Sequence, residues 1–506
     1  MILLILIALI AIYLIQAIYQ SKYWSRVGVP GPPAVPIFGN TFTLMKSKIA
    51  YAFRIAEWTK QYGTTFGIQK GRTNILVTSD ASIIRDVVVD KFDTFYARET
   101  PPTRGDTEIM PRTDVFSAAG KRWKRLRALS SPAFNVQNLK KIMPIIDDSG
   151  NEMMNFLERE YAPGKTINIQ PFFFEFTLDV ICRAALGFEK SMQFKNPYRQ
   201  DLFYFFRHLA HPVIDLSWGF PKLWKVFHML EMLIRRCEGV GVANLFMGLE
   251  KAVNERKARR LAGDINEEPV DFIDVFLNYE DEVDLSKTGE VYNKSNIHVE
   301  KKMSIEEVYS SCFVFLVAGY DTTANVLNFT TFYLAQNPKV QEKLRAEIEE
   351  ICVDETPTYE QLNQLRYADA VMKETLRLTP IASPALARLC SQDTVVGDKK
   401  IPVKKGDCVE VDVVSFHRRK DIWGDDADDF RPERFLEDCK SELNYGFGGG
   451  PRICIGMRLA YLEEKMALVK LLRKYRIHSV PENDKLEICN TVVLTTDDMK
   501  VRLEEL

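Results

Sequence analysis

The sequence predicts a mainly α-helical protein with small β-sheets, preceded by an N-terminal transmembrane helix. Three observations support this fold class. Apolar residues recur at helical spacing over most of the chain. Strand-like runs are few and short, and an apolar stretch long enough to span a membrane stands at the N-terminus. Of the 506 residues, 46% are hydrophobic and 27% charged, a composition typical of a folded globular protein.

Residues 1–20 predict a transmembrane anchor. The run from Met1 to Tyr19 is apolar except for Gln16. At about 1.5 Å per residue it reaches roughly the 30 Å thickness of a bilayer core. A cleaved signal peptide is the alternative, but its basic start, shorter apolar core and small-residue cleavage site are not present. Lys22 and Arg26 follow the run, so the positive-inside rule places the rest of the chain in the cytosol.

The remaining chain divides into a short linker and one large domain. Residues 21–45 are Pro-rich, with Pro30-Gly31-Pro32-Pro33 at their centre. Proline fixes φ and removes a hydrogen-bond donor, which predicts a stiff spacer, although an ordinary loop has the same composition. No linker-like stretch follows, so residues 46–506 predict a single catalytic domain.

Periodicity places the elements of this domain. Helical spacing of apolar residues covers residues 147–160, 223–261, 304–336, 339–352, 367–378 and 456–475. Strand-like runs lie near residues 73–78, 408–413 and 491–495. The polar segment 281–302 predicts a surface loop.

Charge and cysteine content exclude several classes of protein. The formal net charge of -2 argues against a nucleic-acid partner, which would call for a basic bias. Nine scattered cysteines without a C-x-x-C pair argue against a disulfide framework and against covalent c-type haem attachment. Reduced cysteines fit a domain that faces the cytosol.

The most informative motif is at residues 447–456, which read Phe-Gly-Gly-Gly-Pro-Arg-Ile-Cys-Ile-Gly. Consecutive glycines allow the backbone to approach a flat ligand closely. An amphipathic helix follows from Gly456, so Cys454 lies at a helix N-terminus, where the dipole and nearby N–H groups favour a thiolate. A thiolate of this kind can serve as an axial iron ligand. The alternatives are an inert buried cysteine or a phosphate loop, although the G-x-x-x-x-G-K-[ST] pattern is missing.

The pattern F-x-x-G-x-R-x-C-x-G resembles the haem-binding loop of the cytochrome P450 family of haem-thiolate monooxygenases. Its fixed positions are Phe447, Gly450, Arg452, Cys454 and Gly456. The resemblance implies the mainly helical P450 fold and a non-covalent haem b. It also implies that Cys454 is the metal ligand and that Phe447 and Arg452 contact the haem.

A second landmark is the helix that begins after Ser304, where Ser304 and Glu307 form a capping-box pattern. Residues 318–323, at its centre, read Ala-Gly-Tyr-Asp-Thr-Thr. Thr322 can bond back to the carbonyl of Ala318, and together with the glycine this predicts a local groove for a small ligand. The alternative is a buried helix with two polar residues that face a loop. By resemblance, Asp321 and Thr322 are catalytic residues that deliver protons during the activation of dioxygen.

A third landmark is the pair Glu374 and Arg377, on a helix that is apolar on both sides and so predicted to be buried. A buried pair needs further polar partners. The resemblance supplies Arg434, from the sequence Pro432-Glu433-Arg434-Phe435, and implies a structural triad beneath the haem loop.

Trp123 and Arg127 form the fourth landmark, one helical turn apart, and both side chains can donate to a carboxylate. A cationic surface helix is the alternative because other cations surround them, namely Lys121, Arg122, Lys124 and Arg125. By resemblance, the haem propionates are bound by Trp123, Arg127, Arg388 and Arg452. By resemblance, this helix and the one with the later cations Arg458 and Lys465 flank the haem face that carries the thiolate, and a cationic face there would steer an acidic electron donor.

The resemblance implies a monooxygenase that inserts one atom of O2 into a hydrophobic substrate of the xenobiotic, steroid or fatty-acid class. No G-x-G-x-x-G follows a strand and no flavin segment is present, so electrons would come from an NADPH-dependent flavoprotein reductase. The family implies a single-pass protein of the endoplasmic reticulum membrane in contact with lipid. Rival functions are a haem-thiolate isomerase or lyase of the same fold, and a non-catalytic haem-binding protein. The aromatic segment 202–233 borders the substrate entrance by resemblance, or else packs in the core.

Overall fold

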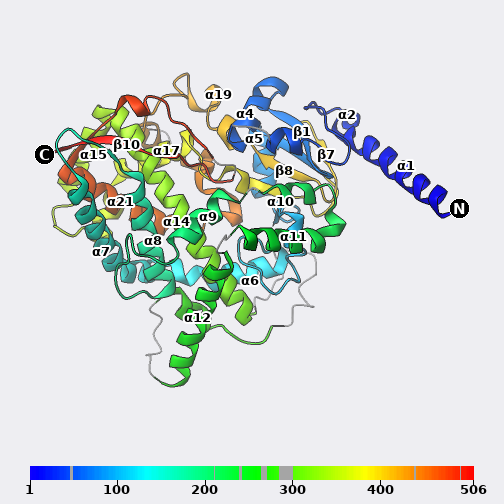
Figure 1. Ribbon diagram of the computed structural model, residues 1–506. Helices are drawn as coiled ribbons and strands as arrows, with labels where there is room; N and C mark the ends of the chain where they lie inside the picture. Colours follow the sequence, from blue (N-terminus) through cyan, green and yellow to red (C-terminus); the bar gives the residue numbers. More distant parts are fainter. Residues whose placement is uncertain are drawn as a thin grey trace.

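The computed structural model describes residues 1–45, 49–209, 211–238, 242–263, 271–283, 300–437, 440–489 and 492–506. Helices form most of the molecule, and the largest sheet lies on the side nearer the N-terminal helix (Figure 1). The predicted combination of many helices with small sheets is therefore confirmed.

The helices of eight residues or more are α1 (Ile2–Ser21), α4 (Tyr51–Tyr62), α6 (Gly120–Ser130), α7 (Val136–Glu160), α8 (Gln170–Leu186), α9 (Arg199–Arg207), α11 (Trp224–Cys237), α12 (Val242–Leu261), α14 (Ile305–Gln336), α15 (Pro338–Ile351), α17 (Arg366–Leu378) and α21 (Met457–Lys474). Shorter α-helices are α2 (Tyr23–Val27), α3 (Thr41–Met45), α5 (Ala81–Arg85), α10 (Pro212–Ser217), α13 (Phe272–Leu277), α16 (Tyr359–Gln364), α18 (Val413–Phe416), α19 (Lys420–Trp423) and α20 (Arg434–Glu437).

The largest sheet joins strands from both halves of the sequence. Its order is β1-β2-β8-β5-β3, with β1 (Thr65–Lys70), β2 (Thr73–Thr78), β8 (Cys408–Val411), β5 (Ala387–Leu389) and β3 (Ala97–Arg98). Only the β2–β8 pair is parallel. A three-stranded sheet contains β4 (Thr166–Asn168), β10 (Lys500–Glu505) and β9 (Tyr475–His478), and a hairpin joins β6 (Thr394–Val396) to β7 (Ile401–Val403).

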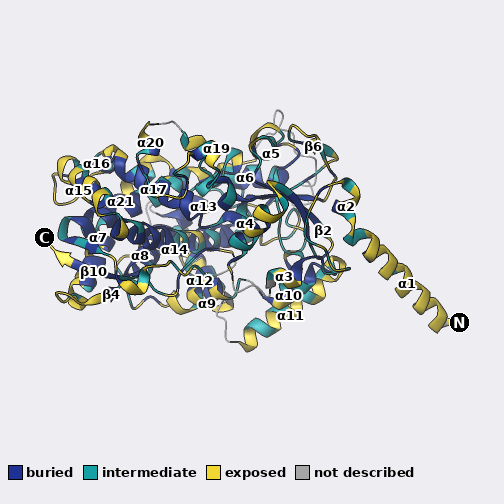
Figure 2. Ribbon diagram, turned by 90° about the horizontal axis from the view of Figure 1, so that it is seen from above, coloured by how far each residue is buried: buried dark blue, intermediate teal, exposed yellow. Residues whose placement is uncertain are grey.

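Helix α14 crosses the centre of the molecule and is buried along most of its length (Figure 2). Its start is fixed by the predicted capping box: Ser304 Oγ accepts the Glu307 N–H at 3.2 Å, and the Glu307 carboxylate accepts the Ser304 N–H at 3.1 Å. It ends before Pro338, which cannot continue the ladder. A helix that is apolar around most of its circumference is stable only when other helices cover it, and α8 packs along it.

Most predicted elements are confirmed, and three need comment. The helical pattern over residues 223–261 corresponds to α11 and α12, and residues 239–241 between them lie outside the described residues. The strand expected at 491–495 is wrong for its described part, which holds only an isolated bridge between Cys489 and Thr495. The C-terminal strand is β10, in which Val501 and Leu503 alternate inward. Most of the expected loop 281–302 lies outside the described residues.

Helix α1 projects away from the rest of the protein, with its apolar side chains exposed (Figures 1 and 2). The stretch Leu3–Ser21 is long and apolar enough to cross a bilayer. An exposed apolar helix of this length is compatible with the predicted membrane anchor.

Part of the Pro-rich segment packs against β1. The Trp24 indole is buried and donates to the Ile68 carbonyl at 2.8 Å. Gly67 faces this ring so closely that a Cβ there would collide with it. Further along, the Gly67 N–H donates to the Pro30 carbonyl and the Asn40 N–H to the Gln69 carbonyl. The division into residues 1–20, 21–45 and 46–506 stays a prediction, but the segment is fixed to the sheet from Trp24 onward.

This packing sets where the anchor can be removed. Deletion of residues 1–19 should weaken membrane association and leave the denaturation midpoint unchanged. Adding Trp24→Ala to that truncated protein should cost about 3–5 kcal/mol, because a buried indole is lost. Urea denaturation, followed by far-UV circular dichroism, measures the denaturation midpoint of both truncated proteins. Equal midpoints for the two proteins would contradict the role of Trp24.

Candidate functional site

The loop before Cys454 is shaped by neighbouring backbone. Gly448 and Gly450 have φ values of 78° and 62°, which favour glycine. A Cβ on Gly450 would also collide with the Val88 carbonyl. The Cys454 N–H donates to the Phe447 carbonyl at 2.9 Å and closes the loop. The need for Gly450 therefore comes from a protein carbonyl, whereas the sequence suggested only a ligand.

Cys454 stands just ahead of α21 and its side chain retains accessible surface. Protein surrounds the sulfur on its other sides, and this burial raises the pKa of the thiol. The N–H groups of Gly456 and Met457, together with the guanidinium groups of Arg127 and Arg98, lower the same pKa but do not offset the burial. The donors expected at a helix N-terminus are thus present, but the expected preference for a thiolate is not met by the protein alone.

The centre of α14 exposes a narrow stripe. Ala318 is exposed and Val314 and Thr322 are partly exposed, while most of the helix is buried. A spacing of four residues puts these three on one face. Thr322 Oγ1 donates to the Ala318 carbonyl at 2.7 Å, as predicted. Gly319 instead faces α8, where a Cβ would stand 2.8 Å from Ile181 Cδ1. The glycine therefore allows close helix packing.

Asp321 lies on a different side of α14 from Thr322. Its side chain is buried, and burial raises its pKa to about 7. Asn325 Nδ2 donates to Asp321 Oδ2 at 3.1 Å. At neutral pH this carboxyl group can therefore hold or release a proton, which is the property required of a general acid.

Two arginines meet where β3 pairs with β5, with Arg98 opposite Arg388. Both donate to the Ala385 carbonyl, at 3.3 and 2.8 Å. Burial lowers the pKa of Arg98 to about 10 and that of Arg388 to about 9. Arg388 was predicted, whereas Arg98 was missed because it stands on a two-residue strand with no motif around it.

The other predicted residues border the same pair. Arg98 donates to the Arg452 carbonyl at 3.3 Å, and the Arg452 guanidinium lies 4.6 Å from the centre of the Trp123 ring. The half-buried Arg127 is close enough to lower the pKa of Cys454. Across the described part of the chain, no carboxylate forms an ion pair with Arg98, Arg127 or Arg388. Phe447, also half-buried, packs edge-on against Tyr461.

The chain is similar to known proteins over most of its length. Residues 29–503 match the family model "Cytochrome P450". The Caenorhabditis elegans cytochrome P450 proteins CYP13A8 and CYP13A10 are 37% and 38% identical to the chain; the alignments cover 93% and 90% of this chain and 93% and 89% of theirs. The C. elegans protein cyp-13B1 is 38% identical over 92% of this chain and 91% of its own.

The chain belongs to the cytochrome P450 family. It is therefore a monooxygenase of the P450 class with haem b as its cofactor. The residues present fit that cofactor. Guanidinium groups that are buried, like that of Arg388, or partly buried, like those of Arg98 and Arg127, are costly without an anion beside them, and haem b carries two propionate groups. The thiol of Cys454 lies within the electric field of two of these cations.

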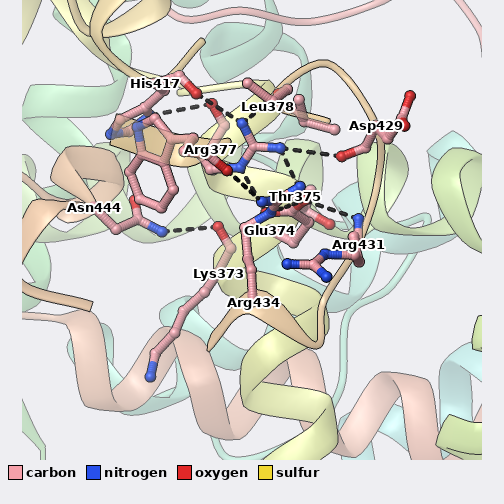
Figure 3. A network of polar contacts seen from close by, with 12 residues as sticks. Lys373, Glu374, Thr375, Arg377, Leu378, His417, Asp429, Arg431, Arg434 and Asn444 are labelled. Atoms are coloured by element: carbon pink, nitrogen blue, oxygen red, sulfur yellow. Dashed lines mark hydrogen bonds and ion pairs between the residues drawn. The ribbon is translucent and has the colours of Figure 1, made fainter. Parts of the chain in front are cut away.

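The predicted triad of Glu374, Arg377 and Arg434 is present as a network of polar contacts (Figure 3). The Arg377 guanidinium donates to both carboxylate oxygens of Glu374 at 2.6 and 2.8 Å, and Arg434 Nε donates to Glu374 at 2.9 Å. His417 connects the network to the loop, because its carbonyl accepts from Arg377 while its Nε2 accepts the Tyr445 N–H at 3.0 Å. All three triad side chains are buried, so the structure supports the predicted structural role.

The expected cationic face is partly wrong. Arg122 and Arg125 are buried and bind Glu307, the capping residue of α14, at 2.9 and 2.7 Å. Lys465 is also buried and pairs with Asp369 at 2.7 Å. The cations that retain exposed surface are Lys121, Lys124 and Arg458. The sequence pattern could not separate the buried from the exposed cations, because the partners Glu307 and Asp369 are distant in the chain.

This assignment predicts a large loss of stability for one substitution and almost no change for its neighbour. Arg125→Glu should destabilise the protein by at least about 3 kcal/mol, because it places a second carboxylate beside the buried Glu307. Lys124→Glu, in the same helix but partly exposed, should change stability by about 0.5 kcal/mol or less. Chemical denaturation of both variants tests this, and a similar loss for Lys124→Glu would contradict it.

Proposed function

We propose that this P450 is a membrane-anchored monooxygenase whose haem iron is held by Cys454, and which inserts one atom of O2 into a hydrophobic organic substrate. The supporting observation is a group of arginines beside an accessible cysteine at a helix N-terminus: the buried Arg388 and the partly buried Arg98 and Arg127, none of which forms an ion pair with a carboxylate among the described residues. This arrangement suits a dianionic planar cofactor with a sulfur ligand, and the P450 membership makes that cofactor haem b.

Each predicted site residue then has a role that follows from its position. Cys454 would supply the sulfur ligand, and Phe447, whose carbonyl accepts the Cys454 N–H, would contact the haem. Propionates would be bound by Arg98, Trp123, Arg127, Arg388 and Arg452. When bound, haem b supplies the redox chemistry of dioxygen activation. Binding of a cation at the sulfur would also lower the pKa that burial has raised.

Protons for the reaction would come from α14. Asp321 holds a proton near neutral pH because it is buried. Thr322 presents its hydroxyl on the accessible stripe, fixed by its bond to Ala318. A buried acid next in sequence to an accessible hydroxyl favours oxygen activation over the isomerase, lyase and non-catalytic alternatives, which need no proton delivery of this kind.

The substrate is proposed to be hydrophobic, of the xenobiotic, steroid or fatty-acid class. The stripe on α14 that would face it is mostly apolar, with Val314 and Ala318. The aromatic segment 202–233 divides into two parts. In α9, Phe205 and Phe206 are buried and contact Phe313 and Tyr320 of α14. Helix α11 exposes an apolar side, which would contact lipid beside the entrance: Val226, Met229, Leu230, Met232 and Leu233.

Electrons are proposed to come from an NADPH-dependent flavoprotein reductase. Lys121 and Lys124 on α6 and Arg458 on α21 could attract an acidic partner to the side of the protein that holds Cys454. With α1 in the endoplasmic reticulum membrane and Lys22 and Arg26 on its inner side, both proteins would meet in the cytosol.

Replacement of the proposed ligand tests the function directly. Cys454→Ala should bind little haem, and any haem that binds should lose the red-shifted Soret band of the reduced CO complex. Cys237→Ala, at an exposed cysteine on α11, is the matched control and should keep that band. Retention of the band in Cys454→Ala would exclude this cysteine as the ligand.

The proposed proton delivery makes a separate prediction. With reductase and NADPH, Thr322→Ala should still consume NADPH but release more peroxide and less product, because the accessible hydroxyl is gone. Thr322→Ser keeps the hydroxyl and should behave like the unaltered protein. The ratio of peroxide formed to NADPH consumed is the measurement. An unchanged ratio in Thr322→Ala would refute the role of this residue.

A further inference from the structure

The buried Asp321 carboxyl has a single side-chain partner among the described residues. Asn325, one helical turn later, donates from Nδ2 to Asp321 Oδ2 at 3.1 Å and to the Asp321 carbonyl at 2.8 Å. Asp321 Oδ1 makes no hydrogen bond within the described ranges. One carboxyl oxygen is therefore held in place, and the other is available to exchange a proton.

The far side of the Asn325 amide is held by a residue distant in sequence. Thr495 Oγ1 lies 2.7 Å from Asn325 Oδ1 and donates to it. The other acceptor near this hydroxyl, the Thr496 carbonyl, is farther away at 3.3 Å. The carbonyl of Asp321 can only accept, so the amide nitrogen must face Asp321 and the amide oxygen must face Thr495. The Thr495 hydroxyl, which can donate or accept, adds a third hydrogen bond to this amide and holds it from the oxygen side.

Thr495 is itself held by backbone contacts on both sides. Cys489 and Thr495 exchange two backbone hydrogen bonds, at 2.8 and 3.3 Å. The Leu494 N–H donates to the Ile381 carbonyl at 2.9 Å, and Gln170 of α8 donates to the Thr496 carbonyl at 2.8 Å. A hydroxyl on a backbone fixed in this way can orient a partner without moving itself.

The side chains of Asp321, Asn325 and Thr495 form a hydrogen-bonded row, the Asp321 row, and differ in exposure. Asn325 has no exposed surface and Asp321 is 5% exposed, whereas Thr495 is partly exposed. A buried amide is costly unless its hydrogen-bonding capacity is used. In α14 the Asn325 side chain uses that capacity to connect the buried acid to the C-terminal segment.

We propose that Thr495 is a positioning residue, which acts through Asn325 to hold the Asp321 carboxyl in the orientation needed for proton delivery to the Thr322 side of α14. This inference rests on the proposed role of Asp321. Loss of the Thr495 hydroxyl would leave the amide held only by its two hydrogen bonds to Asp321, so its contact with Oδ2 would be weakened. The acid would remain buried but would be aligned for a smaller fraction of the time.

Three variants of the full-length holoprotein separate this role from simple packing. Thr495→Val removes the hydroxyl and keeps the shape, and Thr495→Ser keeps the hydroxyl. Thr330→Val is the matched control, because Thr330 is a buried threonine of α14 whose hydroxyl donates to Thr375, not to the Asp321 row. The first readout is the infrared C=O stretch of the protonated Asp321 carboxyl, identified by its disappearance in Asp321→Asn.

We expect this band to move to higher frequency in Thr495→Val, as a carboxyl with a weaker hydrogen bond absorbs there, and to stay in place in Thr495→Ser and Thr330→Val. The second readout is the ratio of peroxide to NADPH consumed with reductase, which needs no identified substrate. It should rise about two- to tenfold in Thr495→Val, the range expected when one hydrogen bond is lost.

The two readouts distinguish a failure of the Thr495 role from a failure of the Asp321 role. If Asp321→Asn raises peroxide release but Thr495→Val leaves both the band and the ratio unchanged, the positioning role is overturned while the role of Asp321 stands. If Asp321→Asn leaves peroxide release unchanged, the role of Asp321 fails and the inference fails with it. A shifted band and a raised ratio in Thr495→Val, both restored in Thr495→Ser, support the inference.

Discussion

Positive charge without a matching carboxylate is the constraint on which the site depends. Arg98 and Arg388 stand opposite each other on β3 and β5, and burial lowers the pKa of both. Protein carbonyls accept some of their hydrogen bonds but cannot balance the charge. No carboxylate in the described part of the chain pairs with them, and a dianionic cofactor would balance their charge, so folding around the site and binding of haem b are expected to stabilise each other.

Two buried carboxylates near the site are each paired with two arginines. Glu374 receives two arginines beneath the Cys454 loop, and Glu307 receives two more where α6 meets the start of α14. Each is buried, and each joins segments far apart in sequence. Such pairs contribute little net stability compared with apolar packing, but breaking one leaves an uncompensated charge in the interior. Their effect is to specify which segments meet.

Helix α14 combines packing and chemistry because its sides differ. Its Gly319 side lies against α8, while Ala318 and Thr322 remain accessible. The Asp321 side chain is not on the accessible stripe; it is buried and hydrogen-bonded to Asn325. An acid whose pKa is near neutrality and a hydroxyl on the accessible stripe are thus neighbours in sequence but stand in different environments. The burial of one and the exposure of the other follow from the helices and the C-terminal segment that surround α14.

The sequence by itself determined the features that depend on local spacing. The capping box at Ser304, the back-bond of Thr322 and the turn that places Cys454 before α21 were all predicted, because their partners lie within a few residues. Tertiary structure decided the rest. Arg98 lies in the site because β3 pairs with β5, which places it opposite Arg388, 290 residues later in the sequence. Arg125 is buried, where it pairs with Glu307, and does not face solvent. A charge pattern shows which side chains are ionised, but only the fold determines their neighbours and their burial, and these decide whether a cation binds a cofactor, supports the fold or faces solvent.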